Sequence, residues 1–266
     1  MAELELTKHH GLGNDFLVAF HPHVDDLPAL ARRMCDRRRG IGADGLLIGE
    51  SQQGYAARMV LYNSDGSRAE MSGNGIRCFA QALARRRGDL EPQRILTDAG
   101  ERLVTLHPTM DPDVIDAAVD MGRVDKIDAP GNWHLIGSDP LRPVSHLSVG
   151  NPHAVVAVDD VTIVDLRSLG AMVPDINLEV VEAGPEPHAI TMRVHERGAG
   201  ITQACGTGAC ASAWAARSWG FVGAELEEIT VHMDGGDAKV RLHQPHDGHV
   251  TLVGPAVLVG SITVRI

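Results

Sequence analysis

The sequence predicts an α+β protein built from two similar halves, and three observations lead to this prediction. Short apolar runs bounded by Gly, Pro, Asp or Asn, which are typical of strands, outnumber segments with helical periodicity. These runs mostly follow one another instead of alternating with helices, which favours α+β over repeated βαβ units. Two glycine-rich motifs also recur about half of the 266-residue chain apart.

Strands are expected where apolar and β-branched residues form short runs. In the first half these are Leu4–Thr7, Phe16–Phe20, Leu46–Ile48, Arg58–Tyr62, Arg94–Thr97 and Arg102–Leu106. In the second half they are Val144–Val149, Ala154–Val158, Ile176–Val181, Ala189–Val194, Glu228–His232, Ala238–Leu242, His249–Val253 and Ala256–Arg265. Helices are expected where apolar residues recur three or four positions apart, namely at Leu27–Arg37, Asn74–Arg87, Val161–Leu169 and Thr207–Trp219.

The repeat pairs two turns together with the helices that follow them. "SGNG" at 72–75 precedes the Ala-rich "IRCFAQALARRRG", and "CGTG" at 205–208 precedes "ACASAWAARSWG". Each helix is closed by a glycine in the usual C-cap position. "GLGNDF" around Asn14 and "SVGNPH" around Asn151 repeat at nearly the same offset. We therefore expect two similar halves that face one another, with two helix N-termini on either side of one cleft.

The chain is expected to divide into two domains near its middle. The boundary is placed near Asp116–Met121, after the polar stretch Thr109–Asp113, and the final strand is expected to cross back to the first half. The predicted domains are residues 1–117 with 255–266, which carry the Ser72 turn and its helix, and residues 118–254, which carry the Cys205 turn and its helix.

Composition and charge restrict the class of partner. The formal net charge of −11 argues against nucleic acid or an anionic membrane surface as a partner. No apolar run approaches the ~20 residues of a membrane span, and the N-terminus has no signal-peptide pattern. The four cysteines form neither a disulfide framework nor a common zinc-binding spacing. We expect a cytoplasmic protein that acts on a small metabolite and binds no metal.

Cys205 stands at the position where a helix N-terminus can act on a thiol. Unpaired N–H groups and the helix dipole favour a thiolate there, so its pKa is expected below the usual value of about 8.5. The same N–H groups can hold a carboxylate. The alternative is a buried structural cysteine, and we assign that role to Cys35, Cys78 and Cys210.

Two such turns across one cleft suggest a reaction with two bases at one carbon. Removing a proton α to a carboxylate and returning one on the other face inverts the stereocentre. Pyridoxal phosphate usually assists such chemistry through a Schiff-base lysine. None of the three lysines lies in a recognisable cofactor setting, and Lys8 in "TKHHGLGN" is the least poor candidate. The residues therefore favour a mechanism without a cofactor, using positioned bases and hydrogen-bond donors.

Four segments, "KHHGLGNDF", "YNSDGSRAEMSGNGIRCFA", "VGNPH" and "HERGAGITQACGTGACASA", resemble in order and spacing the motifs of the diaminopimelate epimerase family. The resemblance extends over essentially the whole chain. It implies two pseudo-symmetric domains, each a mixed β-sheet or barrel around a central α-helix, and a homodimer. It also implies interconversion of LL- and meso-diaminopimelate without a cofactor, in the pathway to lysine and the cell wall.

The resemblance assigns roles residue by residue. Cys205 matches one of the family's two catalytic cysteines, and Ser72 occupies the place of the other. His153 and Glu196 match polar neighbours of the catalytic pair. The substrate-binding residues that it implies are Asn14, Asn63, Gly73, Asn74, Asn151, Asn177, Glu196, Arg197, Gly206 and Thr207. Taken alone, an Asn before Pro such as Asn151 is often only a turn residue.

Ser72 is the main departure from the family pattern. A serine hydroxyl is less acidic than a thiol by more than about five pKa units, so forming an alkoxide costs about 7 kcal/mol more than forming a thiolate. One hypothesis is a natural variant in which Ser72, helped by a neighbour or a water, returns the proton slowly. A second is a Cys→Ser substitution made to trap substrate or to block a disulfide. A third is another activity, such as isomerisation of another amino acid, one-sided proton exchange, elimination or dehydration. A protein that only binds amino acids is the alternative outside enzymes.

Overall fold

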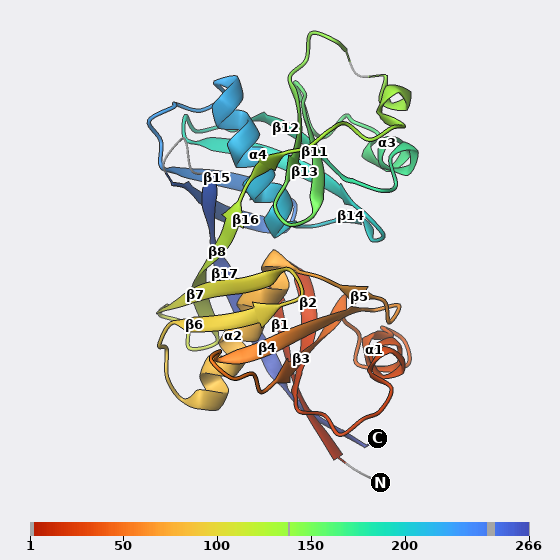
Figure 1. Ribbon diagram of the computed structural model, residues 1–266, viewed down its shortest axis with the longest axis vertical. Coiled ribbons are helices and arrows are strands. Elements are labelled where there is room, and N and C mark those ends of the chain that lie inside the picture. The colour runs from red at the N-terminus through yellow and green to blue at the C-terminus, as the bar shows by residue number, and fades with distance from the viewer. Residues whose placement is uncertain (1–2, 138, 244–247, 266) are drawn as a thin grey trace. The chain divides into compact units, whose positions relative to one another are not determined.

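The computed structural model (Figure 1) describes residues 3–137, 139–243 and 248–265. The chain divides into two compact units, Met1–Val119 with Gly254–Ile266, and Asp120–Val253. Strands β8 (Val114–Arg123) and β17 (His249–Arg265) each begin in one unit and end in the other. The strands of both units are linked in one hydrogen-bonded sheet, and each unit has its own long helix.

Unit 1 is a ring of strands. Its elements are β1 (Glu3–Gly11), β2 (Asn14–Phe20), α1 (Leu27–Cys35), β3 (Gly45–Glu50), β4 (Ala57–Asn63), β5 (Arg68–Ala69), α2 (Gly73–Arg87), β6 (Gln93–Thr97), β7 (Gly100–Pro108), β8 and β17. The pairs β2–β3 and β4–β6 are parallel, whereas β1–β2, β3–β4, β6–β7 and β7–β8 are antiparallel. The ring closes because β17 pairs with both β8 and β1.

Unit 2 repeats this arrangement. Its elements are β9 (Asp125–Lys126), η1 (Trp133–Ile136), β10 (Val144–Ser148), β11 (Pro152–Ala157), α3 (Leu166–Met172), β12 (Asn177–Ala183), β13 (Ala189–Glu196), β14 (Gly200–Thr202), α4 (Gly206–Trp219), β15 (Glu228–Met233), β16 (Gly236–Leu242) and the start of β17. The pairs β11–β12 and β13–β15 are parallel, and β10–β11, β12–β13 and β15–β16 are antiparallel. Element by element, β1 to β7 with α1 and α2 correspond to β10 to β16 with α3 and α4.

Each unit wraps its strands around one helix. Helix α2 packs against β1, β2, β3, β4 and β7, and helix α4 packs against β10, β11, β12, β13, β15 and β16. Every residue of α2 from Gly73 to Ala84 is buried, as are those of α4 from Gly206 to Ala213. A helix that is buried on all sides must be lined by small and apolar residues, which explains the Ala-rich sequences. The predicted α+β class with a central helix in each half is confirmed.

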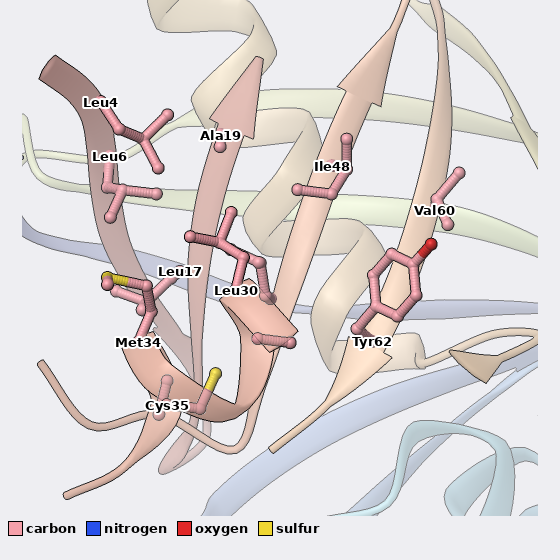
Figure 2. Close-up of a cluster of buried hydrophobic side chains, with 13 residues drawn as sticks. Leu4, Leu6, Leu17, Ala19, Leu30, Met34, Cys35, Ile48, Val60 and Tyr62 are labelled. Carbon is pink, nitrogen blue, oxygen red and sulfur yellow. The ribbon is translucent and has the colours of Figure 1, made fainter. Parts of the chain in front are cut away.

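A second layer of unit 1 lies outside its ring, where α1 covers the outer face of β1 to β4. Figure 2 shows this cluster, with side chains from α1 directed at those of the strands. The labelled members are Leu4, Leu6, Leu17, Ala19, Leu30, Met34, Cys35, Ile48, Val60 and Tyr62. Their burial removes this face of the sheet from water, at roughly 1.5–3 kcal/mol for each large apolar side chain. Cys35 is therefore a packing residue, as expected.

Several elements differ from the prediction. Val114–Arg123, which contains the predicted domain boundary, is a strand with alternating burial, and its Asp116 and Asp120 are exposed. The third helix begins at Leu166 and not at Val161, because the carboxylate of Asp165 caps it by accepting from the Ser168 N–H. In addition, β17 is one continuous strand where two were expected, and β5, β9, β14 and η1 were not predicted. No helix in the described residues is both long and apolar enough to cross a membrane.

Candidate active site

The two repeated turns have the same local structure. Ser72 and Cys205 are the N-cap residues of α2 and α4, with φ −139° and ψ 124° at Ser72 and φ −126° and ψ 114° at Cys205. The Ser72 hydroxyl accepts from the Gly75 N–H at 3.0 Å, and the Cys205 sulfur accepts from the Gly208 N–H at 3.4 Å. Both helices therefore present a hydroxyl or thiol beside the unpaired N–H groups of their first turn.

In unit 1, a chain of polar side chains lies behind the Ser72 turn. The Asn74 amide nitrogen donates to Oδ1 of Asn14 at 3.3 Å, and the Asn14 amide nitrogen donates to Asp44 at 2.8 Å. Arg77 is fully buried and donates to Oδ1 of Asn74 at 2.6 Å and to the Gly73 carbonyl at 3.0 Å. The structure thus brings together the predicted residues Asn14, Gly73 and Asn74. It also adds Arg77, which the sequence reasoning missed.

The other predicted residues of unit 1 are less enclosed. Asn63 ends β4, is exposed, and donates through its amide nitrogen to the Ser67 hydroxyl at 3.0 Å. Lys8 donates to the Gly42 carbonyl at 2.7 Å and pairs with Asp15 at 3.0 Å. The Lys8 ammonium is therefore held in a local ion pair.

In unit 2, five side chains form a continuous series of contacts that reaches Cys205. His153 Nδ1 lies 2.7 Å from Oε1 of Glu179, and both side chains are fully buried. His153 Nε2 lies 3.0 Å from Oδ1 of Asn151, whose amide nitrogen donates to the Thr207 hydroxyl at 3.3 Å. The Thr207 hydroxyl lies 3.5 Å from the Cys205 sulfur. Glu179 was not predicted.

Asn177 and Arg197 lie together at the start of β12 and the end of β13. The Asn177 amide oxygen accepts from the Arg197 N–H at 2.9 Å, and its amide nitrogen donates to the Pro152 carbonyl at 2.8 Å. The buried Asn177 side chain thus links the start of β11 to the turn that follows β13, whereas Arg197 is exposed. Next to them, the carboxylate of Glu196 accepts a short hydrogen bond from the Thr202 hydroxyl.

The expectation of a lowered pKa at Cys205 is wrong for this structure. Burial raises the pKa of the Cys205 thiol well above its usual value, and the nearby carboxylates of Glu196 and Glu179 raise it further. The Thr207 hydroxyl and the Gly208 N–H act in the opposite direction but do not balance these effects. Burial also raises the pKa of Glu196, which shares a hydrogen bond with Cys205. Cys205 therefore rests as a thiol and needs a base to deprotonate it.

The sequence contains a signal that could have identified Glu179 as a residue of the site. It interrupts the apolar run "INLEVV", which is buried on both faces of β12, and a charge there requires a partner. A Cβ placed on Gly208 would lie 2.6 Å from Oε1 of Glu179, so this position of α4 has no room for a side chain. The second oxygen of Glu179 has no hydrogen-bond partner among the described residues.

Unit 1 has apolar side chains where unit 2 has this pair. His153 is paired with Asn177 across β11 and β12, and Phe16 is paired with Gly45 across β2 and β3. The position of His153 therefore corresponds to that of Phe16. Two residues further along each partner strand, Glu179 corresponds to Leu47. An imidazole and a carboxylate thus accompany the thiol, whereas an aromatic ring and a leucine accompany the serine.

The remaining cysteines are packing residues, as expected. Burial raises the pKa of both Cys35 and Cys78 to about 12, and Cys210 is fully buried. Within the described ranges, no group of three or more His, Cys, Asp or Glu side chains could hold a metal ion.

Solved structures with the same fold include racemases and epimerases. A phenazine biosynthesis protein of the PhzF family from Bacillus anthracis superposes with a TM-score of 0.77 at 15% identity, covering 100% of both chains. A hydroxyproline epimerase from Agrobacterium vitis, with bound trans-4-OH-L-proline, has a TM-score of 0.68 at 16% identity, covering 99% of this chain and 91% of that one. At these identities the likeness shows the fold alone.

Sequence comparison identifies the family. The diaminopimelate epimerase family model matches residues 6–127 and 145–259. The diaminopimelate epimerase of Pelotomaculum thermopropionicum is 37% identical over 97% of this chain and 98% of its own length. That of Gloeothece citriformis is 39% identical over 95% and 96%. The chain belongs to the diaminopimelate epimerase family, and it is an isomerase of the epimerase type.

Proposed function

We propose that the protein interconverts LL- and meso-diaminopimelate by moving a proton at Cα, without a cofactor. The observation that supports this most directly is the pair of matched N-caps. One carries a thiol beside buried acid and base groups, and the other carries a hydroxyl in the same backbone geometry. Members of the same family, 36–39% identical, carry the name diaminopimelate epimerase.

In the proposed first step, Cys205 takes the proton from Cα. Because its thiol is buried between carboxylates, Cys205 must first give up its own proton, and Glu196 is the acceptor that we propose. The raised pKa of Glu196 brings this carboxyl closer to the range in which it can hold a proton. As the C–H bond breaks, negative charge moves onto the substrate carboxylate. The N–H groups of Gly206 and Thr207 are suited to stabilise that charge.

In the proposed second step, Ser72 gives its hydroxyl proton to the other face of the carbanion. A hydroxyl is a poor base, but the carbanion is far more basic than an alkoxide, so Ser72 can serve as an acid in this direction. The Gly75 N–H lies within hydrogen-bond distance of the oxygen left behind. A water then passes to Ser72 the proton that Glu196 took from Cys205, which restores the starting state of all three groups. The donation by Ser72 is the step that the missing thiol makes slow, because leaving an alkoxide costs more than leaving a thiolate.

The other predicted residues are proposed to bind the substrate. Gly73 and Asn74, which follow Ser72, hold the α-carboxylate of the substrate. Gly206 and Thr207, which follow Cys205, hold it from unit 2. The polar groups of the substrate form hydrogen bonds with the side-chain amides of Asn14, Asn63, Asn151 and Asn177. Glu196 also binds the distal amino group, and the Arg197 guanidinium is suited to the distal carboxylate through its planar pair of donors.

The test is direct conversion of LL-diaminopimelate, followed by separating the isomers on a chiral column. Inversion that disappears in Cys205→Ala, but persists in the control Cys210→Ala, is the expected result. In the parent protein, proton exchange at Cα without inversion would support one-sided exchange instead. Binding of substrate with neither exchange nor inversion would overturn the proposal and support a binding protein.

We also propose the setting that the family implies: a homodimer in the cytoplasm, serving the synthesis of lysine and the cell wall. Light scattering of the purified protein tests the dimer, and a monomer at micromolar concentration would refute it. Rescue of a strain that requires diaminopimelate tests the pathway.

A further inference from the structure

We propose that Glu179, His153, Asn151 and Thr207 form one directed chain of hydrogen bonds. In the last of these hydrogen bonds the Thr207 hydroxyl donates to the Cys205 sulfur, which favours the thiolate form of Cys205. Glu179 and Thr207 are then positioning residues for Cys205, and His153 acts through Asn151 instead of exchanging a proton with the substrate. The inference rests on the proposed function only in taking Cys205 as the reactive group.

The direction of the chain is set at His153. The atom of Asn151 that faces His153 Nε2 is the amide oxygen, at 3.0 Å, and an amide oxygen can only accept. Nε2 must therefore carry a hydrogen. The 2.7 Å contact between His153 Nδ1 and Glu179 then contains one shared proton, on either the ring or the carboxylate. With both nitrogens engaged and the ring fully buried, His153 has no nitrogen left for a substrate proton.

The same direction continues to the sulfur. With its oxygen turned to His153, Asn151 presents its NH₂ group to the Thr207 hydroxyl, which accepts at 3.3 Å. The hydrogen of that hydroxyl is then available to the Cys205 sulfur, 3.5 Å away. A thiolate can only accept, so this arrangement suits the thiolate better than the thiol. The Thr207 hydroxyl does lower the pKa of Cys205, against the effect of burial.

The matching chain of unit 1 has the opposite direction. Arg77 donates to Asn74, Asn74 donates to Asn14, and Asn14 donates to Asp44. These donors lead toward a carboxylate and not toward the cap residue Ser72. Of these two series of contacts between described residues, the one beside the thiol leads to the N-cap atom, and the one beside the hydroxyl leads to Asp44. This difference accompanies the replacement of Phe16 and Leu47 by His153 and Glu179.

Two effects of Glu179 on Cys205 can be separated by their sign. As a bare negative charge, Glu179 disfavours the thiolate, so its removal should make Cys205 more reactive. As the anchor of the chain, Glu179 keeps a hydrogen on Nε2 and fixes the Asn151 amide, so its removal should make Cys205 less reactive. The shared proton leaves the Glu179–His153 pair without net charge, so we expect the second effect to dominate. The other titratable group facing the sulfur, Glu196, is the same in both cases.

The first test measures alkylation of Cys205 by iodoacetamide as a function of pH, by mass spectrometry of its peptide. It needs no substrate, so a protein that failed to act on diaminopimelate would leave it informative. Thr207→Val should slow alkylation about tenfold below the midpoint and move the midpoint to higher pH, as expected for losing one donor to a charged group. Thr207→Ser, which keeps the hydroxyl, should remain within about threefold of the parent. Equal rates in the parent and Thr207→Val would overturn the proposal.

The second test uses the far end of the chain. Glu179→Gln can still donate to His153 Nδ1 and should keep the parent midpoint, whereas Glu179→Leu should raise it. Faster alkylation in both variants would show that Glu179 acts only as a charge, and would refute the chain. If Glu179→Leu fails to fold, the double variant His153→Phe with Glu179→Leu copies the apolar pair Phe16 and Leu47. We expect the double variant to fold and to show the raised midpoint.

Discussion

Gly208→Ala is the change that most directly probes the packing of Glu179 against helix α4. The added Cβ would lie 2.6 Å from Oε1 of Glu179, whereas ordinary contact begins at 3.4 Å, so the carboxylate must retreat by about 0.8 Å. An exposed glutamate could do so at little cost. Glu179 is fully buried and held at 2.7 Å by His153, so a retreat of this size disturbs that hydrogen bond.

The magnitude follows from two opposing contributions. Losing a hydrogen bond to a charged group costs roughly 1.5–3 kcal/mol. Alanine gains about 1 kcal/mol over glycine in a helix, and Gly208 has no left-handed backbone angle that would cancel this gain. We therefore expect Gly208→Ala to lower the free energy of unfolding by about 0.5–2 kcal/mol.

A double-mutant cycle by urea denaturation checks the cause. In a Glu179→Ala background the clash with the carboxylate is gone, so Gly208→Ala should be neutral or stabilising by up to about 1 kcal/mol. Gly75→Ala is the matched control, because its Cβ would meet Ser72 at 3.1 Å and Phe16 at 3.4 Å and no carboxylate. It should show no coupling to Glu179. An equal cost for Gly208→Ala in both backgrounds would refute the reasoning.

Two further predictions concern the hydroxyl of unit 1 and a surface histidine of unit 2. Ser72→Cys should speed inversion of LL-diaminopimelate by at least about tenfold, because a thiol gives up its proton more easily than a hydroxyl; an unchanged rate would show that Ser72 takes no part in the slow step. Burial lowers the pKa of His232, but hydrogen bonds with Asp237 at 2.8 Å and Glu186 at 2.9 Å outweigh it, so the folded-state pKa is raised. Its stabilisation is therefore complete below about pH 6.5 and is lost as the pH rises through the folded-state value. His232→Asn should cost up to about 1 kcal/mol in acid and almost nothing in alkali. A cost that is the same in acid and alkali, measured by urea denaturation, would contradict this assignment.

Much of the fold could be predicted from the sequence because each of the repeated motifs is formed by residues close together in the sequence. The turns at Ser72 and Cys205, the Ala-rich helices after them and the glycines that close them depend on residues a few positions apart. Strand β8 was missed because residues 116–121 were interpreted as the boundary between the two halves, although Asp116 and Asp120 occupy the outward positions of a strand that alternates regularly. The start of α3 was misplaced because the capping role of Asp165 was overlooked.

The electrostatics of the site could not be predicted in the same way. A cysteine thiol at a helix N-terminus is expected to have a lowered pKa, but this expectation takes account only of the helix and not of the strands around it. The carboxylates of Glu179 and Glu196 belong to β12 and β13, outside the helix, and together with burial they raise the pKa of Cys205 instead. Arg77 was missed for a similar reason, because its partners Gly73 and Asn74 become visible only once the helix is built.

The central claim, that Cys205 and Ser72 serve opposite faces of one carbon, is tested by inversion in heavy water. LL-diaminopimelate is incubated to low conversion, and deuterium at Cα is measured separately in the meso product and in the recovered LL substrate. Two groups that each serve one face place solvent deuterium in the product, while the recovered substrate keeps its original hydrogen. Deuterium in the recovered LL substrate, with little or no meso product, would contradict the account, because it would show that a single group removes and returns the proton on one face.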